Sequence, residues 1–196
     1  MKLDTALYDQ IFEKIKPLLR TGRPGDFAHT KSVYRLMIDY CQDKKYRLDP
    51  RIALPAAILH DCGYGFIKKK LIRLFTGHAK IASMKDAVNR MTLAYVPAFL
   101  REFGFTEKEI NSISLIIQYS DEDTVSVQNP SIELQILHDL NLYDRFLPHR
   151  VKTLRILYPD KAKTLSILER ALEYIILPEI KDKAAQSMKK LRYENR

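Results

Sequence analysis

Histidine and aspartate stand together at two places in the chain, each time within the same four-residue sequence. ILHD occupies residues 58–61 and again residues 136–139. A carboxylate or imidazole buried on an apolar helix is costly unless it is paired, hydrogen-bonded or bound to a metal. His29 raises the same question, because it begins the apolar face of another expected helix. One shared divalent ion would offset all of these costs, since imidazole nitrogen and carboxylate oxygen suit Mn, Fe, Mg, Co, Ni or Zn.

The two ILHD segments differ in their surroundings. The first closes the apolar segment 52–59 and is followed by glycines that are expected to end the helix. The second lies inside an expected helix, where Asp139 falls on the same face as Ile136. His138 falls on a different face and is interpreted as a bystander. Plainer interpretations stay open: His29 as a hydrogen-bonded residue at a helix end, Asp139 as a salt-bridge partner, and an HD dipeptide as coincidence.

The elements that must position these residues are predicted to be helices. Apolar residues recur at three- and four-residue spacing, and no segment shows strand-like alternation of useful length. The length of 196 residues suits one domain, 1–196, with a core at about 25–147 on which the N-terminal helix and the segment 148–196 pack. Helices are expected over 4–20, 27–45, 50–61, 78–95 and 97–103, from the Thr106–Glu109 capping box onward, and over 130–146. The C-terminal segment 148–196 is also expected to be helical, with a long last helix that begins at about 160 and is interrupted or ended near Pro178.

Three segments taken in order, DFAHTKSVYR, AAILHDCGYG and ELQILHDLNLYDRF, resemble the HD-domain superfamily of metal-dependent phosphohydrolases. The signature of that superfamily is a His, then a His-Asp pair, then a distant Asp in a leucine-rich helix. The resemblance spans about residues 25–147 and implies an all-α, HD-domain-like helical bundle. It also implies that one divalent metal ion is held by four side chains, namely His29, His60, Asp61 and Asp139.

The activity that the resemblance implies is hydrolysis of a phosphate ester or anhydride. The expected substrate is a nucleotide or another small phosphorylated molecule, attacked by metal-activated water. Asp61 is the expected catalytic residue, because it can both ligate the ion and accept a proton from the water. The alternative is a catalytically reduced nucleotide-binding or regulatory module of the same type. Candidate substrate-binding residues are His78, Lys31, Lys68, Lys80 and Arg145.

Two departures from the family pattern concern the rest of the site. Relatives that hold further metal ions have extra histidines between the HD pair and the last Asp, and here His78 alone resembles one of them. Some nucleotide-hydrolysing relatives also carry an Arg three residues before the first His. In this chain that place is taken by Asp26, and Arg23 lies further upstream.

The charge of the chain is compatible with several partners. The net charge is +9, with the densest basic runs in the connector 66–77 and the tail 181–196. A phosphorylated small substrate or a solvated basic surface explains this charge, and a nucleic-acid partner is disfavoured because no reading motif or interleaved aromatic residues accompany it. The chain shows neither a signal-peptide pattern nor an apolar run of transmembrane length, and its two cysteines are far apart. We therefore expect a soluble, cytoplasmic protein without a membrane partner.

Overall fold

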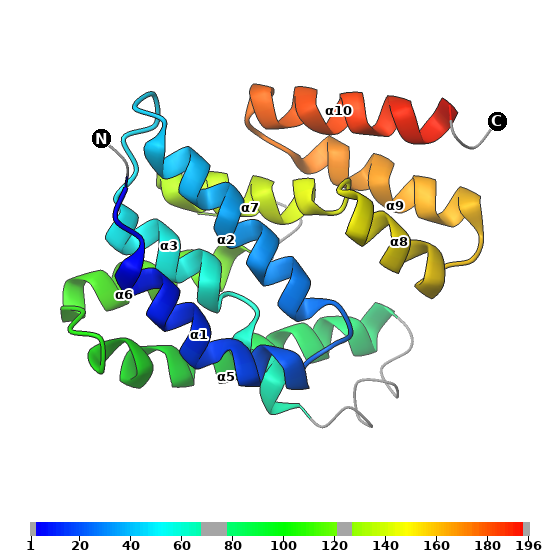
Figure 1. The fold of residues 1–196 in the computed structure, drawn as a ribbon. Coiled ribbons are helices and arrows are strands. Elements are labelled where there is room, and N and C mark those ends of the chain that lie inside the picture. Colours follow the sequence, from blue (N-terminus) through cyan, green and yellow to red (C-terminus); the bar gives the residue numbers. More distant parts are fainter. Residues whose placement is uncertain (1–2, 68–77, 121–126, 194–196) are drawn as a thin grey trace.

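The computed structural model describes residues 3–67, 78–120 and 127–193, and these residues form an all-α fold (Figure 1). Within them there are nine α-helices, one short 3-10 helix and no strand, which confirms the predicted fold class. The helices are α1 (Ala6–Thr21), α2 (Asp26–Gln42), α3 (Pro50–Leu59), the 3-10 helix η1 (Cys62–Phe66), α5 (His78–Arg101), α6 (Glu107–Ser120), α7 (Ile132–Asp144), α8 (Pro148–Leu157), α9 (Lys161–Tyr174) and α10 (Pro178–Tyr193).

Helix α2 lies at the centre of the packing, against both α3 and α7. Helix α6 packs on α3, α5 and α7, while α1 covers α3 and η1. The last three helices form a group beside α7, in which α9 and α10 contact α7 and α8 contacts α9 (Figure 1). One hydrophobic core runs through this arrangement from Tyr8 of α1 to Met188 of α10.

Two of the predicted helix starts are confirmed by their caps. The carboxylate of Asp49 accepts a hydrogen bond from the backbone N–H of Arg51 at 2.9 Å, and Pro50 follows it at the first position of α3. The capping box before α6 is reciprocal. Glu109 accepts from the backbone N–H of Thr106 at 2.7 Å, and the Thr106 hydroxyl accepts from the N–H of Glu109 at 3.3 Å.

The structure differs from the predicted helices at two places. The segments 78–95 and 97–103 are one helix, α5, which continues through Pro97 because Val96, Phe99 and Leu100 on either side of it are buried in the core. Residues 148–157, within the C-terminal segment that was expected to be helical, form a separate helix, α8. The interruption expected near Pro178 is confirmed, because α9 ends at Tyr174 and α10 begins at Pro178.

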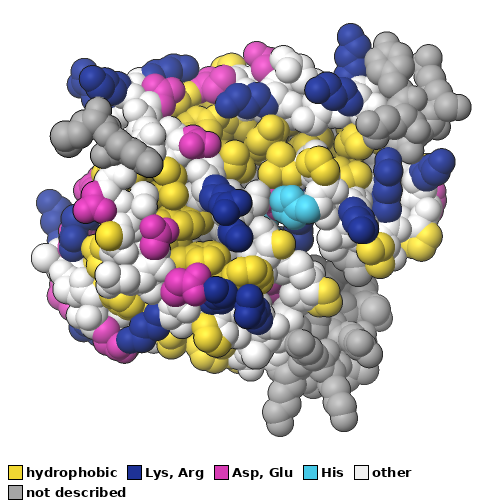
Figure 2. Space-filling model, viewed as in Figure 1, with side chains coloured by type: hydrophobic (Ala, Val, Ile, Leu, Met, Phe, Trp, Pro, Cys, Tyr) yellow, Lys and Arg dark blue, Asp and Glu magenta, His cyan; other side chains and the backbone are white. Residues whose placement is uncertain are grey.

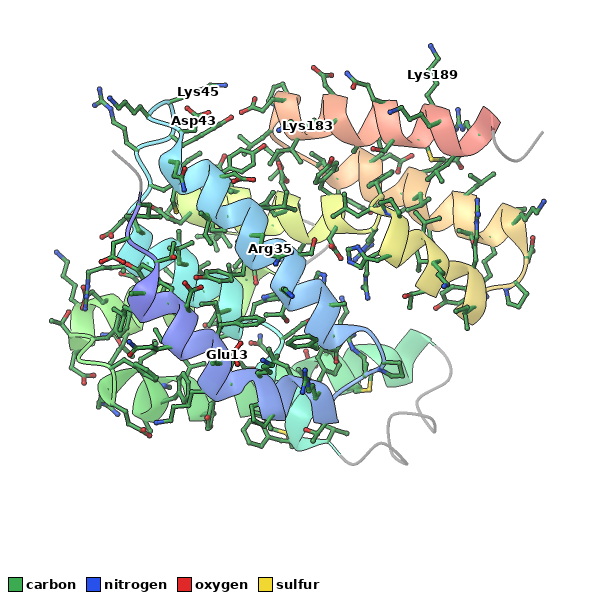
Figure 3. The ribbon with its side chains drawn as sticks, in the orientation of Figure 1. Glu13, Arg35, Asp43, Lys45, Lys183 and Lys189 are labelled. Atoms are coloured by element: carbon green, nitrogen blue, oxygen red, sulfur yellow. The ribbon has the colours of Figure 1, made fainter. Side chains whose placement is uncertain are left out.

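On the face shown in Figure 2, charged side chains lie among hydrophobic areas, and Lys and Arg are spread rather than gathered in one basic area. The side chain of Lys189 extends away from α10 (Figure 3), and Lys45, in the turn after α2, pairs with Glu179 of α10 at 3.2 Å. In the described ranges, no helix combines the length and the apolar character that crossing a bilayer requires.

The turn after α3 is held close to α5 by a glycine. The backbone N–H of Gly63 donates to the Thr92 hydroxyl at 3.0 Å, and that hydroxyl donates to the carbonyl of Val88 at 3.0 Å. A Cβ atom on Gly63 would overlap both the Val88 carbonyl oxygen and Thr92 Oγ1. The sequence His60-Asp61 therefore leads into a turn whose position depends on the absence of a side chain.

We predict that Gly63→Ala lowers the free energy of unfolding by about 1–3 kcal/mol, because the backbone of α5 or of the turn must move to admit the methyl group. Urea denaturation followed by circular dichroism measures this loss. Gly104→Asn is the matched control. Gly104 has a φ of 74°, a Cβ there meets nothing within 4 Å, and Asn tolerates this backbone conformation. An equal loss in both variants would contradict the close approach described here.

Candidate metal centre

Two histidines and one aspartate converge where the start of α2 meets the end of α3. His29 lies in the first turn of α2, His60 follows the last residue of α3, and Asp61 precedes η1. The two helices pack side by side, which brings their side chains together from distant parts of the sequence. His29 Nε2 is 3.2 Å from His60 Nε2, and the Oδ2 atom of Asp61 is 3.6 and 3.7 Å from these two nitrogens.

Hydrogen bonds on the far side of each imidazole set which nitrogen faces the group. His29 Nδ1 is 2.7 Å from a carboxylate oxygen of Asp144, and His60 Nδ1 is 3.0 Å from the carbonyl oxygen of Ala57. A neutral imidazole has one N–H, and both of these partners accept hydrogen bonds, so the N–H belongs on Nδ1 in each ring. The two Nε2 lone pairs and a carboxylate oxygen then face one another, a donor set that fits a divalent metal ion.

Asp61 is ionised in these surroundings. Burial by itself raises the pKa of this carboxyl, but the neighbouring His60, Arg23 and His29 side chains lower the pKa well below its ordinary value. All three members of the group are buried, with exposed fractions of 6–7%. The site therefore combines an ionised carboxylate with two imidazoles in a place where water screens charge weakly.

Arg23 is held against this site by Asp26. The Asp26 carboxylate accepts hydrogen bonds from the backbone N–H of Arg23 at 2.6 Å and from its Nε at 2.9 Å. The guanidinium lies over the ring of Tyr64, 3.3 Å from its centroid, and its Nη2 donates to Asp61 at 3.1 Å. Asp26, which lies three residues before His29, thus orients an arginine that comes from further upstream.

Asp144 contacts His29, through its carboxylate, on the side of the ring that faces away from His60 and Asp61. It is the last residue of α7, it is fully buried, and it also lies 3.1 Å from Nε of Arg150 and 3.3 Å from Nε2 of His149. Burial raises the pKa of its carboxyl, but the hydrogen bond and charge of His29 with the charge of Arg150 lower it overall. Sequence reasoning missed Asp144, although it follows the buried Leu140 by one helical turn.

Asp139 does not join the group, which corrects the expected set of four ligands. Its carboxylate accepts hydrogen bonds from the backbone N–H of Leu177 at 2.6 Å, from that of Ile176 at 3.0 Å, and from His138 Nδ1 at 2.9 Å. It is fully buried and ties α7 to the connection between α9 and α10. This carboxylate can be buried because backbone N–H groups, rather than a metal ion, bind it.

The other candidate residues are placed as follows. Lys31 is half-buried on α2, two residues beyond His29. Arg145 follows Asp144 at the C-terminal cap of α7. His78 and Lys80 lie in the first turn of α5, but their side chains, like the whole of Lys68, lie outside what the structure describes.

Comparison of the chain with protein-family models, with curated proteins and with solved structures finds no match. The resemblance to the HD-domain superfamily and the activity that it implies therefore stay predictions. What stands independently of them is an all-α fold with a buried group, His29, His60 and Asp61, that could hold a metal ion.

Asp139→Asn tests the structural role of that carboxylate. We expect the free energy of unfolding to fall by about 2–4 kcal/mol, because two backbone N–H donors would lose a charged acceptor in a buried position. Chemical denaturation gives the value, and Asp182→Asn on the exposed side of α10 is the control. A loss below about 0.5 kcal/mol, the range of ordinary surface substitutions, would contradict this role.

Proposed function

We propose that the protein is a metal-dependent hydrolase that cleaves a phosphate ester or anhydride bond of a nucleotide or another small phosphorylated molecule. The observation that carries this proposal is the convergence of His29 Nε2, His60 Nε2 and Asp61 Oδ2, three electron-pair donors within reach of one ion. The residues that bear them are the ones that resemble the HD signature. Arginines beside the group supply the positive charge that phosphate oxygens require.

The donor set favours a transition metal over Mg, because two of its three donors are imidazole nitrogens. A divalent ion bound there would supply a nucleophile at neutral pH by lowering the pKa of water, and would polarise a phosphoryl oxygen. Asp61 keeps one carboxylate oxygen toward the imidazoles, so the carboxylate can also accept a proton from the attacking water. Burial of the group keeps bulk water from competing for these positions.

Arg23 and Arg150 are the residues proposed to hold the phosphate. Arg23 contacts Asp61 directly, and Arg150, which contacts Asp144, lowers the pKa of the Asp61 carboxyl through its charge. His149 is 39% exposed in its side chain and can add a further hydrogen bond. A guanidinium presents paired N–H donors to a phosphate, and its fixed charge stabilises the charge that develops in phosphoryl transfer.

The proposal predicts that purified protein binds about one equivalent of Mn, Co, Ni, Fe or Zn, and that this loading supports hydrolysis of p-nitrophenyl phosphate or of a nucleotide. Asp61→Asn and His60→Gln should each lower metal affinity and turnover by more than about 100-fold, because each removes a direct donor. Elemental analysis after metal loading and a release assay for inorganic phosphate measure the two effects.

Asp182→Asn serves again as the control, since it removes an exposed carboxylate far along the sequence from the site. Metal content unchanged in Asp61→Asn and His60→Gln would defeat the metal assignment, and a proton shared between the two imidazoles would then explain their approach. Stoichiometric metal without turnover of any ester or nucleotide would defeat the hydrolase assignment and favour the regulatory alternative.

Asp144 and Asp139 offer a paired test on one helix. Asp144→Asn should weaken metal binding by about 10–100-fold, because the carboxylate that orients His29 and sets its N–H position is lost. Asp139→Asn should leave metal affinity within about threefold of the wild type, since its carboxylate contacts backbone N–H groups instead. Titration of each folded variant with Co(II), followed by visible absorbance, gives both affinities. A larger loss of metal affinity in Asp139→Asn than in Asp144→Asn would contradict the roles given to the two carboxylates.

A further inference from the structure

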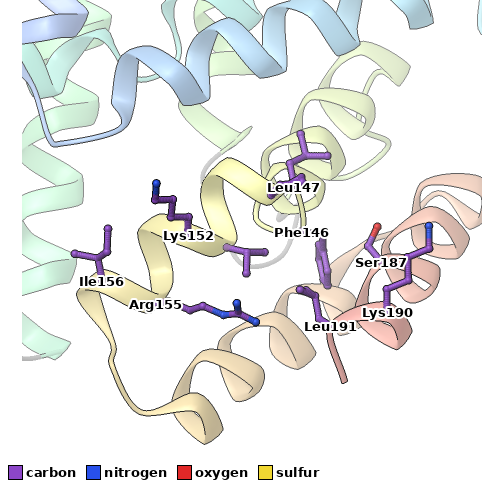
Figure 4. Close-up of a pocket in the computed structure, with 10 residues that line it drawn as sticks. Phe146, Leu147, Lys152, Arg155, Ile156, Ser187, Lys190 and Leu191 are labelled. Carbon is purple, nitrogen blue, oxygen red and sulfur yellow. The ribbon is translucent and has the colours of Figure 1, made fainter. Parts of the chain in front are cut away.

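A pocket of about 350 Å³ lies where α2 ends, lined by residues from the end of that helix, from the turn that follows it and from the start of α10. It is separate from the larger pocket, of about 640 Å³, between α8 and α10 (Figure 4), and no residue lines both. None of the three metal-site residues lines it. Its volume is within the range of about 300–1,000 Å³ that small-molecule sites occupy, so it can hold a ligand of its own.

Two carboxylates of this pocket stand at the unfavourable end of a helix. Asp39 lies in the last turn of α2 and Asp43 is its C-cap, where backbone carbonyls carry partial negative charge, and the last turn contains no basic residue. The Asp43 carboxylate accepts a hydrogen bond from the backbone N–H of Lys45 at 2.9 Å, but within the described part of the chain neither carboxylate has an ion pair. Helix stability therefore does not explain their placement, and such departures from local preference are typical of functional sites.

The rings of Tyr40 and Tyr46 form the apolar part of the pocket, with centroids 5.2 Å apart and planes tilted by 50°. Tyr40 is only 8% exposed, yet its hydroxyl makes no hydrogen bond with any residue that the structure describes. Burial and then the negative charge of Glu179 raise the pKa of this phenol to about 12. A buried hydroxyl without a partner, in a place of negative potential, is suited to accept a hydrogen bond from a cationic ligand.

Two ammonium groups of the protein itself show how the pocket accommodates a cation. Lys45 Nζ is 5.0 Å from the ring centroid of Tyr46 and pairs with Glu179 at 3.2 Å. Lys183 Nζ is 5.5 Å from the ring centroid of Tyr40. Figure 3 shows Lys45 in the turn after α2 and Lys183 on α10. Both rings thus lie within cation–π range of an ammonium group, and the third carboxylate of the pocket is neutralised by an ion pair.

We propose that this pocket binds a small aliphatic diamine. Its two ammonium groups would pair with Asp39 and Asp43, which are four residues apart and so neighbours on the surface of α2. Its methylene chain would lie on the rings of Tyr40 and Tyr46. Among the described residues, the carboxylates of this pocket do not form a group close enough to hold a metal ion, so two charges on one flexible chain fit better than a single ion. This site is independent of the proposed hydrolase function.

Different head groups on one short chain test the ligand class. Calorimetric titration of the full chain at low ionic strength compares 1,4-diaminobutane, butylamine, 1,4-butanediol and 4-aminobutyrate. The diamine should bind about fivefold or more tightly than butylamine, because its second ammonium group meets a second carboxylate while the first is already bound. Butanediol should not bind, and 4-aminobutyrate should bind no more tightly than butylamine, because one of the two aspartates would repel its carboxylate.

Substitutions that remove charges of opposite sign locate the binding. Asp39→Asn and Asp43→Asn should each weaken diamine binding by about three- to tenfold, and asparagine at 43 keeps an oxygen that can accept from Lys45. Lys183→Gln should instead strengthen it by about two- to fivefold, because a competing ammonium group leaves the pocket. Asp182→Asn is the matched control, because Asp182 is an exposed carboxylate next to Lys183 that does not line the pocket. Circular dichroism shows that each variant is folded.

Tyr40→Phe tests the buried phenol separately, since it removes only the hydroxyl. It should weaken diamine binding by about two- to fivefold, the effect of one hydrogen bond.

Four results would overturn the proposal. Equal affinities for the diamine and butylamine would show that the two carboxylates do not act together. Binding of 4-aminobutyrate as tight as that of the diamine would show that the pocket takes a zwitterion. Affinity for the diamine that is unchanged in both Asp39→Asn and Asp43→Asn would place the diamine elsewhere on the surface. No heat from the diamine at millimolar concentration would leave the pocket without this ligand.

Discussion

The approach of two imidazole nitrogens and a carboxylate oxygen is the constraint on which the candidate site depends. Each of the three atoms carries a lone pair, and they lie within 4.8 Å of one another in a buried position. Such atoms repel unless a cation lies among them, and weak screening in the interior enlarges that repulsion. The cations at hand are the Arg23 guanidinium, which reaches Asp61, and a proton or metal ion between the rings. A single metal ion could accept all three donors together, so this group could hold one.

The surrounding fold keeps these atoms together through short-range packing. Helix α2 lies along α3, so the first turn of one meets the last turn of the other. Gly63 lets the chain after Asp61 run directly against α5, and Asp26 fixes Arg23 by two hydrogen bonds. The site therefore does not rest on a single flexible loop. It rests on helix ends whose positions are set by a core that contains Ile58 and Leu59 immediately before His60.

The helical spacing of apolar residues was sufficient to predict the fold class and most of the helices, because each helix buries one apolar face. Caps at Asp49 and Thr106 located two helix starts to within a residue. Three of the four expected metal ligands come together, because His29, His60 and Asp61 lie at the ends of helices that pack on each other. Asp139 does not, since its surroundings depend on the connection at residues 175–177, about which local sequence carries no information. The segment from 148 onward was expected to be helical, but its division into α8 and α9 was not predicted, because residues 148–157 have few apolar positions.

Helix α8 contacts two separate parts of the molecule. His149 and Arg150, in the first turn of α8, contact Asp144 and through it His29. Val151, Lys152 and Arg155 of the same helix line the pocket beside α10. Helix α8 thus contacts the candidate metal centre through the carboxylate of Asp144 at its start and borders the pocket beside α10 further along.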